Sequence, residues 1–273
     1  PQALPGATLA RVADKCRGVG TSLKILITGA AGYIGSHLAQ HLSTNPQYRM
    51  VLIDLAGEDH GPWGAIKQLD LADKPALEEL FSTEQLDGVI HLAALGNIQR
   101  SFEDPLAFYA CNLVNTINLL ELCARYNVNK FVFPSSAAVY QAEEPGPLTE
   151  TAPKQPQNPY GRTKLACEQI LEDTSNACQD FSYVVLRLFM VVAGGGNPLL
   201  DSKTKGDTHP IRIAAQAALG KREKMVIFGD QFDTPDGTCV RDYVHIEDVC
   251  RMMSAALEYL EQGNPSQVLN CGT

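Results

Sequence analysis

Tyr160 and Lys164 are the residues whose types and spacing most clearly suggest acid–base chemistry. They stand four positions apart at the start of a predicted helix, 160–177, so their side chains lie on one helix face. A free phenol titrates at about 10, and a base that works near neutral pH needs a pKa roughly 3 units lower, which corresponds to about 4 kcal/mol in favour of the phenolate. A lysine ammonium one turn away supplies part of this stabilisation. The pair therefore predicts a tyrosine base.

The same spacing occurs a second time, at Tyr126 and Lys130. The intervening Asn127-Val128-Asn129 is predicted to end one helix and lead into a strand, so these two side chains do not share a helix face. We interpret this second pair as part of the surface. Spacing alone is therefore weak evidence, and the alternative for Tyr160 and Lys164 is also a helix-face pair without a catalytic role.

A neighbouring hydroxyl strengthens the catalytic interpretation. Ser135 and Ser136 follow the predicted strand 131–133. In parallel sheets, ligands bind at the carboxyl ends of the strands, where a serine can hold a substrate oxygen beside the phenol. Successive strand residues point to opposite sides, so the residues alone leave open which of the two serines does this.

The elements that must position these residues begin with a glycine-rich turn. Thr28-Gly29-Ala30-Ala31-Gly32-Tyr33-Ile34-Gly35 joins an apolar strand, 23–27, to a segment of helical periodicity. Glycine lets the backbone approach a ligand, and the N–H groups of the helix start face a phosphate. The next strand, 50–53, ends in Asp54, whose carboxylate can bind an adenosine ribose. This combination predicts dinucleotide binding rather than a plain packing turn, and Leu55, in place of an arginine, favours NAD over NADP.

Strands and helices alternate through residue 190, which predicts an α/β fold with a doubly wound parallel sheet of the Rossmann type. We predict an NAD-binding domain at 22–190 and a smaller C-terminal substrate-binding lobe at 191–273. A short strand at 225–228 belongs to this lobe, and its closing helix, 247–259, can pack back on the first domain. Residues 1–21 are interpreted as a disordered leader.

Composition narrows the expected partners. A net charge of −9 over 273 residues argues against nucleic acid or an anionic membrane as the main partner. The eight cysteines form no Cys-x-x-Cys pair and no Cys/His cluster, which predicts no metal site and a reduced compartment, the cytoplasm. No apolar run approaches the roughly 20 residues of a membrane span. A small-molecule substrate is therefore expected.

Several segments together resemble the extended short-chain dehydrogenase/reductase family, and in particular its nucleotide-sugar 4-epimerase branch. The matching segments are TGAAGYIGSH, the strand-terminal Asp54, HLAA, FVFPSSAAVY, NPYGRTK and FGDQFDTPDGTCVRDYVHIEDV. The resemblance implies NAD-dependent 4-epimerisation of a nucleotide-diphosphate sugar, UDP-glucose/UDP-galactose before others, by transient oxidation at C4.

The resemblance also implies roles for individual residues. Ser136, Tyr160 and Lys164 are expected to be catalytic, with Ser136 preferred to Ser135 on this ground. The residues expected to bind NAD are Gly29, Gly32, Tyr33, Ile34, Gly35, Asp54, Asp70, Leu71, Leu92, Ala93, Ala94, Asn112, Tyr160 and Lys164. The residues expected to bind substrate are Ser136, Tyr160, Met190, His209 and Arg241, of which Arg241 holds the diphosphate.

This chain departs from the branch at several positions. Met190 stands where the branch has an asparagine, and Gly96 stands where a lysine reaches the cofactor. Arg212 is either a phosphate partner or a surface charge. Ala137 and Ala138 replace the Asp-Glu pair of the family's dehydratases, so dehydration is disfavoured because alanine moves no proton.

Two other functions remain as alternatives: an NAD-dependent nucleotide-sugar oxidoreductase with net turnover of cofactor, and a non-catalytic NAD-binding or scaffold protein of the same fold. Family members pair through two long helices, here 105–126 and 160–177, which predicts a homodimer. The chain ends on Asn270-Cys271-Gly272-Thr273, which matches a strand that further residues follow in the family. The substrate lobe is therefore expected to be incomplete.

Overall fold

The computed structural model describes residues 22–57, 63–141, 146–192, 210–227 and 229–272. The strands of this part of the chain are β1 (Leu23–Thr28), β2 (Tyr48–Asp54), β3 (Ile66–Gln68), β4 (Gly88–His91), β5 (Lys130–Ser136), β6 (Ser182–Leu188), β7 (Met190–Val192), β8 (Tyr243–His245) and β9 (Gln267–Cys271). Its helices are α1 (Tyr33–Ser43), α2 (Lys74–Glu84), α3 (Ile98–Glu103), α4 (Pro105–Phe108), the π-helical η1 (Tyr109–Val114), α5 (Asn115–Tyr126), the 3₁₀ turn η2 (Ala137–Val139), α6 (Pro159–Ala177), α8 (Pro210–Ala218) and α9 (Ile246–Glu261).

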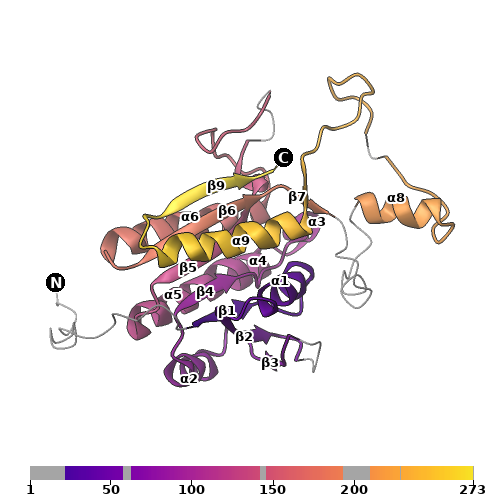
Figure 1. Ribbon diagram of the computed structural model, residues 1–273. Coiled ribbons are helices and arrows are strands. Elements are labelled where there is room, and N and C mark those ends of the chain that lie inside the picture. The colour runs from indigo at the N-terminus through magenta and orange to yellow at the C-terminus, as the bar shows by residue number, and fades with distance from the viewer. Residues whose placement is uncertain (1–21, 58–62, 142–145, 193–209, 228, 273) are drawn as a thin grey trace.

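Seven parallel strands form the central sheet, in the order β3-β2-β1-β4-β5-β6-β9 (Figure 1). The chain moves outward from β1 to β3 and then crosses to the other side of β1, so the order reverses between β1 and β4. The doubly wound parallel sheet predicted from the alternation of strands and helices is confirmed. In such sheets the ligand site lies at this reversal, outside the carboxyl ends of the strands.

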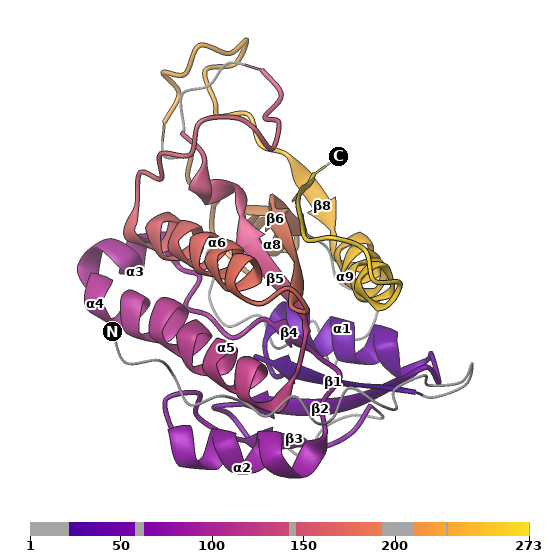
Figure 2. The same ribbon diagram turned by 90° about the vertical axis from the view of Figure 1, so that its left-hand side faces the viewer.

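Helices cover both faces of the sheet (Figure 2). On one face α1 and α9 pack over Ile25, Ile27 and Ile90, and on the other α2, α5 and α6 pack over Leu26 and Val89. Successive residues of one strand point to opposite faces, and both faces are buried. The strands are apolar at nearly every position for this reason.

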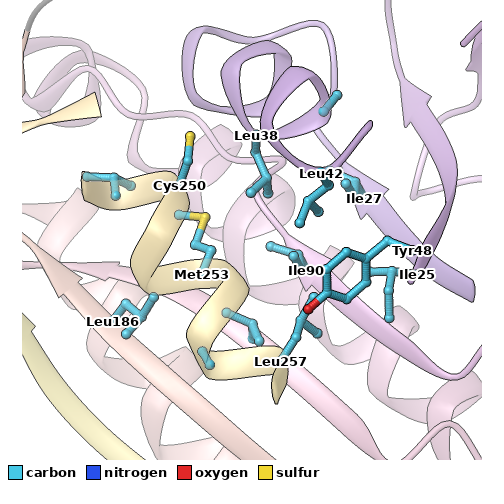
Figure 3. Packing of buried hydrophobic residues seen from close by; sticks show 14 of the residues in the cluster. Ile25, Ile27, Leu38, Leu42, Tyr48, Ile90, Leu186, Cys250, Met253 and Leu257 are labelled. Carbon is cyan, nitrogen blue, oxygen red and sulfur yellow. The ribbon is translucent and has the colours of Figure 1, made fainter. Parts of the chain in front are cut away.

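Helix α9 closes the first of these two layers. Figure 3 shows Cys250, Met253 and Leu257 of α9 directed at Leu38 of α1 and at the sheet beneath. Strand β9 follows α9 and pairs with β6. The last described residues therefore join the first sheet, whereas α8 and the loop after it stand apart from it (Figure 1). The division into domains at residue 190 stays a prediction.

Two predicted elements differ from what the structure describes. Residues 225–227 form no strand, because they are exposed and no neighbouring strand pairs with them, and residue 228 lies outside the described part of the chain. The long helix at 105–126 is present, but its middle is the π-helical segment η1. By length and composition this helix could cross a membrane. In the fold it covers the sheet instead, because Leu119 and Cys123 lie in the core.

Candidate active site

A cavity of about 470 Å³ lies at the carboxyl ends of β1 to β4, beside the point where the strand order reverses. Most of the residues predicted to bind NAD line it: Gly29, Gly32, Tyr33, Asp54, Asp70, Leu71, Leu92, Ala93 and Ala94. The carboxylate of Asp54 accepts hydrogen bonds from the N–H groups of Ala31, 3.0 Å, and Ala56, 3.1 Å. The acidic side chain at the end of β2 is thereby fixed against the glycine-rich turn.

The glycine-rich turn brings β1 and β4 together at this cavity. Gly29 has a φ of +70°, which favours glycine, and a Cβ atom there would lie 2.6 Å from the backbone nitrogen of Ala93. Gly32 caps the start of α1 with an extended backbone. Gly32 therefore places no side chain of its own between the start of α1 and a ligand in the cavity.

A second cavity of about 390 Å³ adjoins the first and contains the predicted catalytic residues Ser136, Tyr160 and Lys164. Ile34 and Gly35, also predicted to bind the cofactor, line this cavity. The two cavities share wall residues, which are Gly29, Gly32, Tyr33, Leu92 and Ala94. A ligand that fills the first cavity can therefore extend to the phenol and the ammonium in the second.

Helix α6 presents Tyr160 and Lys164 to the second cavity. Its start is capped by Asn158, whose side chain accepts a hydrogen bond from the Gly161 N–H at 2.8 Å. A Cβ atom on Gly161 would collide with the carbonyl oxygen of Ala138, so the first turn of α6 lies directly on η2. This contact sets the distance between the helix and the end of β5.

The surroundings of the Lys164 ammonium and of the Tyr160 phenol shift their pKa values in opposite directions. The Lys164 ammonium donates to the carbonyl oxygen of Pro134 at 2.8 Å and lies 4.5 Å from the centre of the Phe133 ring. Burial lowers the pKa of Lys164 to about 8. Burial also raises the pKa of Tyr160, and a hydrogen bond with the Ser136 side chain acts in the opposite direction. The phenol is therefore protonated at neutral pH in this structure.

The two serines at the end of β5 have different partners. The Ser135 hydroxyl is buried and donates to Glu168 at 2.5 Å. Ser136 is half-buried, accepts from the Ala138 N–H at 3.2 Å and lines the second cavity together with Tyr160. The geometry therefore favours Ser136 as the hydroxyl of the site, the alternative that the residues alone left open.

Asn112 does not line either cavity. Its side chain accepts from the Leu95 N–H at 2.8 Å and donates to the Leu95 carbonyl oxygen and to Thr163, both at 3.0 Å. Asn112 is buried in η1 behind the wall that Leu95 forms. It holds the wall of the cofactor cavity in place, and its predicted contact with NAD stays a prediction.

The residues predicted to bind substrate are only partly brought together. Ser136 and Tyr160 line the second cavity, whereas Met190 lies on β7 between two residues that do, and its own side chain does not. Arg241 is exposed and donates to the carbonyl oxygen of its neighbour Val240 at 2.9 Å. His209 lies outside the described residues.

Several residues of the cavity walls were not predicted from the sequence. Cys111 and Asn115 line the first cavity from η1 and the start of α5, and Phe189 and Val191 line the second. A π-helical turn shifts the register of the residues after it, and the apolar periodicity of 105–126 does not reveal such a turn. Apolar residues after β6 carry no chemical signal that separates a cavity wall from the core.

A network of buried polar side chains lies behind the wall of the first cavity. The Thr116 hydroxyl donates to the Asn112 carbonyl oxygen at 2.6 Å and lies 3.0 Å from Nε2 of His91, so it accepts a hydrogen bond from the N–H group of that nitrogen. The Nδ1 atom of His91 then accepts from Thr28, at 2.7 Å, and Thr28 in turn accepts from the Ala93 N–H. A neutral His91 thus connects the ends of β1 and β4 with the η1–α5 helix.

This network predicts a pH-dependent stability. Burial lowers the pKa of His91 from 6.5 to about 3. Unfolded His91 takes up a proton as the pH falls below about 6.5 while the folded form stays neutral, so the free energy of unfolding falls by about 2 kcal/mol between pH 7 and pH 5. In denaturant titrations, His91→Gln is expected to reduce this fall by that amount. Equal pH dependence in wild type and His91→Gln would contradict the assignment.

Comparisons with known proteins agree with this architecture. The sequence pattern of the NAD dependent epimerase/dehydratase family matches residues 25–272. The UDP-glucose 4-epimerase of Rhizobium meliloti is 36% identical over 251 residues, which cover 91% of this chain and 76% of that protein. A structure of UDP-glucose 4-epimerase from Brucella ovis in complex with NAD matches with a TM-score of 0.82 at 34% identity, over 92% of this chain and 78% of that chain.

A second solved structure extends the comparison to the substrate side. UDP-glucose-4-epimerase from Stenotrophomonas maltophila, with bound NAD and formylated UDP-arabinopyranose, matches with a TM-score of 0.84 at 33% identity, over 92% of this chain and 78% of that chain. The family pattern, over residues 25–272, includes all the residues that line the two cavities. The chain belongs to the NAD dependent epimerase/dehydratase family.

Proposed function

We propose that this chain catalyses the NAD-dependent 4-epimerisation of a nucleotide-diphosphate sugar, with UDP-glucose and UDP-galactose as the first pair to test. The observation that carries the proposal is the shared wall of the two cavities, which joins the cavity of the glycine-rich turn and Asp54 to Ser136, Tyr160 and Lys164. Relatives named UDP-glucose 4-epimerase support it, as do similar structures that contain NAD and a UDP-sugar.

The residues of the first cavity fit NAD. Gly29 leaves a cradle that a Cβ atom would fill, and Asp54 holds a carboxylate at the end of β2, where a ribose hydroxyl can donate to it. Leu55, the next residue, also lines the cavity, so the 2′-phosphate of NADP would face a carboxylate and an apolar side chain. Bound in this cavity, NAD would supply the hydride acceptor and donor for C4 of the sugar, and the positive charge of its oxidised ring would favour the Tyr160 phenolate.

The side chains of the second cavity divide the proton chemistry between them. Tyr160 takes the proton of the 4-hydroxyl and later gives it back, while Ser136 holds the same oxygen. Lys164, one helical turn after Tyr160, keeps a positive charge close to the phenol. Leu188, Phe189 and Val191 give the cavity an apolar part of its wall. Dehydration finds no support, because η2 carries alanine at both positions after Ser136.

The proposed function is tested by incubating the protein with UDP-galactose, without added NAD, and separating the products by chromatography. UDP-glucose is expected as product, without net change in the absorbance of reduced nicotinamide, because the enzyme retains its cofactor. A net gain of NADH would replace the proposal by an oxidoreductase. Bound NAD without any product from several nucleotide sugars would favour a non-catalytic binding protein.

We also infer that two copies of the chain pair through α3, α4 and α5 together with α6. Large apolar side chains are exposed along this segment, namely Ile98, Phe102, Leu106, Val114 and Ile117. Placing a carboxylate in such an interface is expected to weaken pairing about 100-fold, because a charge loses its water there. In sedimentation velocity, Leu106→Glu is expected to be monomeric, while Leu219→Glu, at an exposed position after α8, stays dimeric. A wild-type monomer would contradict the inference.

The cytoplasm is the compartment we propose for this chemistry. The seven cysteines in the described part of the chain are all free thiols, several of them buried in the core. Free thiols persist where glutathione and thioredoxin keep proteins reduced.

A further inference from the structure

A buried ion pair lies behind the second cavity without lining it. The guanidinium of Arg187, on β6, donates to both carboxylate oxygens of Glu168, on α6, at 2.6–3.2 Å, and both side chains are at least 90% buried. Replacing such a pair by apolar residues is often neutral for stability. The pair is therefore not explained by stability alone, and its two side chains also make hydrogen bonds to other residues.

Glu168 fixes the residue before Ser136. It lies one helical turn after Lys164 on the same face of α6, and its carboxylate accepts from the Ser135 hydroxyl at 2.5 Å. Lys164 in turn donates to the carbonyl oxygen of Pro134. One face of α6 thus hydrogen-bonds to Pro134 and Ser135, two consecutive residues of β5. The next residue, Ser136, lines the second cavity beside Tyr160.

Arg187 fixes the segment after Ser136. Arg187 is directly opposite Ser135 on the neighbouring strand, and its guanidinium donates to the Tyr140 hydroxyl at 2.7 Å and stacks over that ring at 4.9 Å. The Tyr140 hydroxyl donates to Asn270 of β9 at 2.6 Å. Because Ser136 lies between Ser135 and Tyr140, the ion pair holds the chain on both sides of it.

We propose that the Glu168–Arg187 pair positions the Ser136 hydroxyl against Tyr160 by holding Ser135 on one side and Tyr140 on the other. Glu168 and Arg187 touch neither cavity, so they are positioning residues, and their effect on the reaction passes through Ser136. This inference rests on the proposed epimerase function for its kinetic consequences, and on the geometry alone for its effect on Tyr160.

The experiment uses Ser135→Ala and Tyr140→Phe, each of which removes a single oxygen and leaves the two charges paired. Each is expected to lower kcat for UDP-galactose by about 10-fold or more, with KM and bound NAD within about twofold of wild type, because small displacements of reacting groups are costly. Tyr48→Phe removes a partly buried hydroxyl that donates to Glu258, on the other face of the sheet, and is expected to leave kcat unchanged.

A double-mutant cycle separates positioning from a general structural effect. In a Ser136→Ala background, Ser135→Ala is expected to cause no further loss of kcat, because the group it positions is gone. An undiminished loss in that background, or an unchanged kcat in the single variants, would overturn the proposal.

A second measurement is independent of turnover. The absorbance of tyrosinate is measured as the pH is raised, for each protein and for its Tyr160→Phe derivative. The difference between the two curves gives the titration of Tyr160. The pKa of Tyr160 is expected to be higher in Ser135→Ala than in wild type, because the hydrogen bond with Ser136 lowers it. If the wild-type chain does not convert UDP-galactose, the proposed function is wrong, and this titration still tests the positioning role. An equal pKa of Tyr160 in Ser135→Ala and in wild type would contradict that role.

Discussion

Tyr160→Phe is expected to lower kcat by about 10³-fold while leaving bound NAD and the folded structure unchanged. The phenol lies in the second cavity with Ser136 and can exchange a proton with a sugar hydroxyl there, and removal of a positioned acid–base group costs about 10²–10⁴ in rate. Phenylalanine keeps the ring, so packing at the start of α6 is preserved. The measurement is steady-state conversion of UDP-galactose, with NAD content determined on the same sample.

Tyr126→Phe is the matched control for this variant. Tyr126 also has a lysine four positions later, but its hydroxyl lies 3.3 Å from Glu78 on α2 and faces neither cavity. This substitution is expected to leave kcat within about twofold of wild type, because it removes only a weak, partly exposed hydrogen bond. Equal losses of activity in both variants would remove Tyr160 from the proposed mechanism.

The parts of the site that sequence analysis could predict are those whose chemistry is local. The glycine-rich turn, Asp54 and the Tyr160–Lys164 pair each depend on a residue type within a few positions of an element end. The first cavity brings the turn and Asp54 together, and the second contains the pair. The carboxyl ends of parallel strands lie at one edge of the sheet. Once the strands were predicted correctly, these residues could therefore be placed near one another without knowledge of how the helices pack.

The contacts that sequence analysis missed are those between distant elements. Glu168 and Arg187 are ordinary charged residues in the sequence, and only the packing of α6 on β6 reveals that they are buried and paired. The same holds for β9, whose place beside β6 depends on long-range pairing rather than on its own pattern. The separate role of Ser135 follows from this packing as well, because its partner lies on another element.

Gly29→Ala is expected to remove most of the bound NAD, to below about a tenth of the wild-type content. Gly29 has a φ of +70°, and a Cβ atom there would lie 2.6 Å from the Ala93 nitrogen and 2.8 Å from the Ala93 Cα. These are backbone atoms of the opposite cavity wall, so they can yield only if the end of β4 moves. Such a movement displaces Leu92 and Ala93 from the cleft that the cofactor fills. The content of NAD released on denaturation measures the effect.

Gly263→Ala separates backbone strain from this collision. Gly263, in the turn after α9, has a φ of +75° and no atom within 4 Å of a Cβ position. Both variants carry the cost of a left-handed alanine, about 1 kcal/mol in the free energy of unfolding, and Gly29→Ala alone displaces the cavity wall. Gly263→Ala is therefore expected to melt at a lower temperature and to keep its NAD. Retention of NAD in Gly29→Ala would mean that the close approach of β1 and β4 is not what shapes the cofactor site.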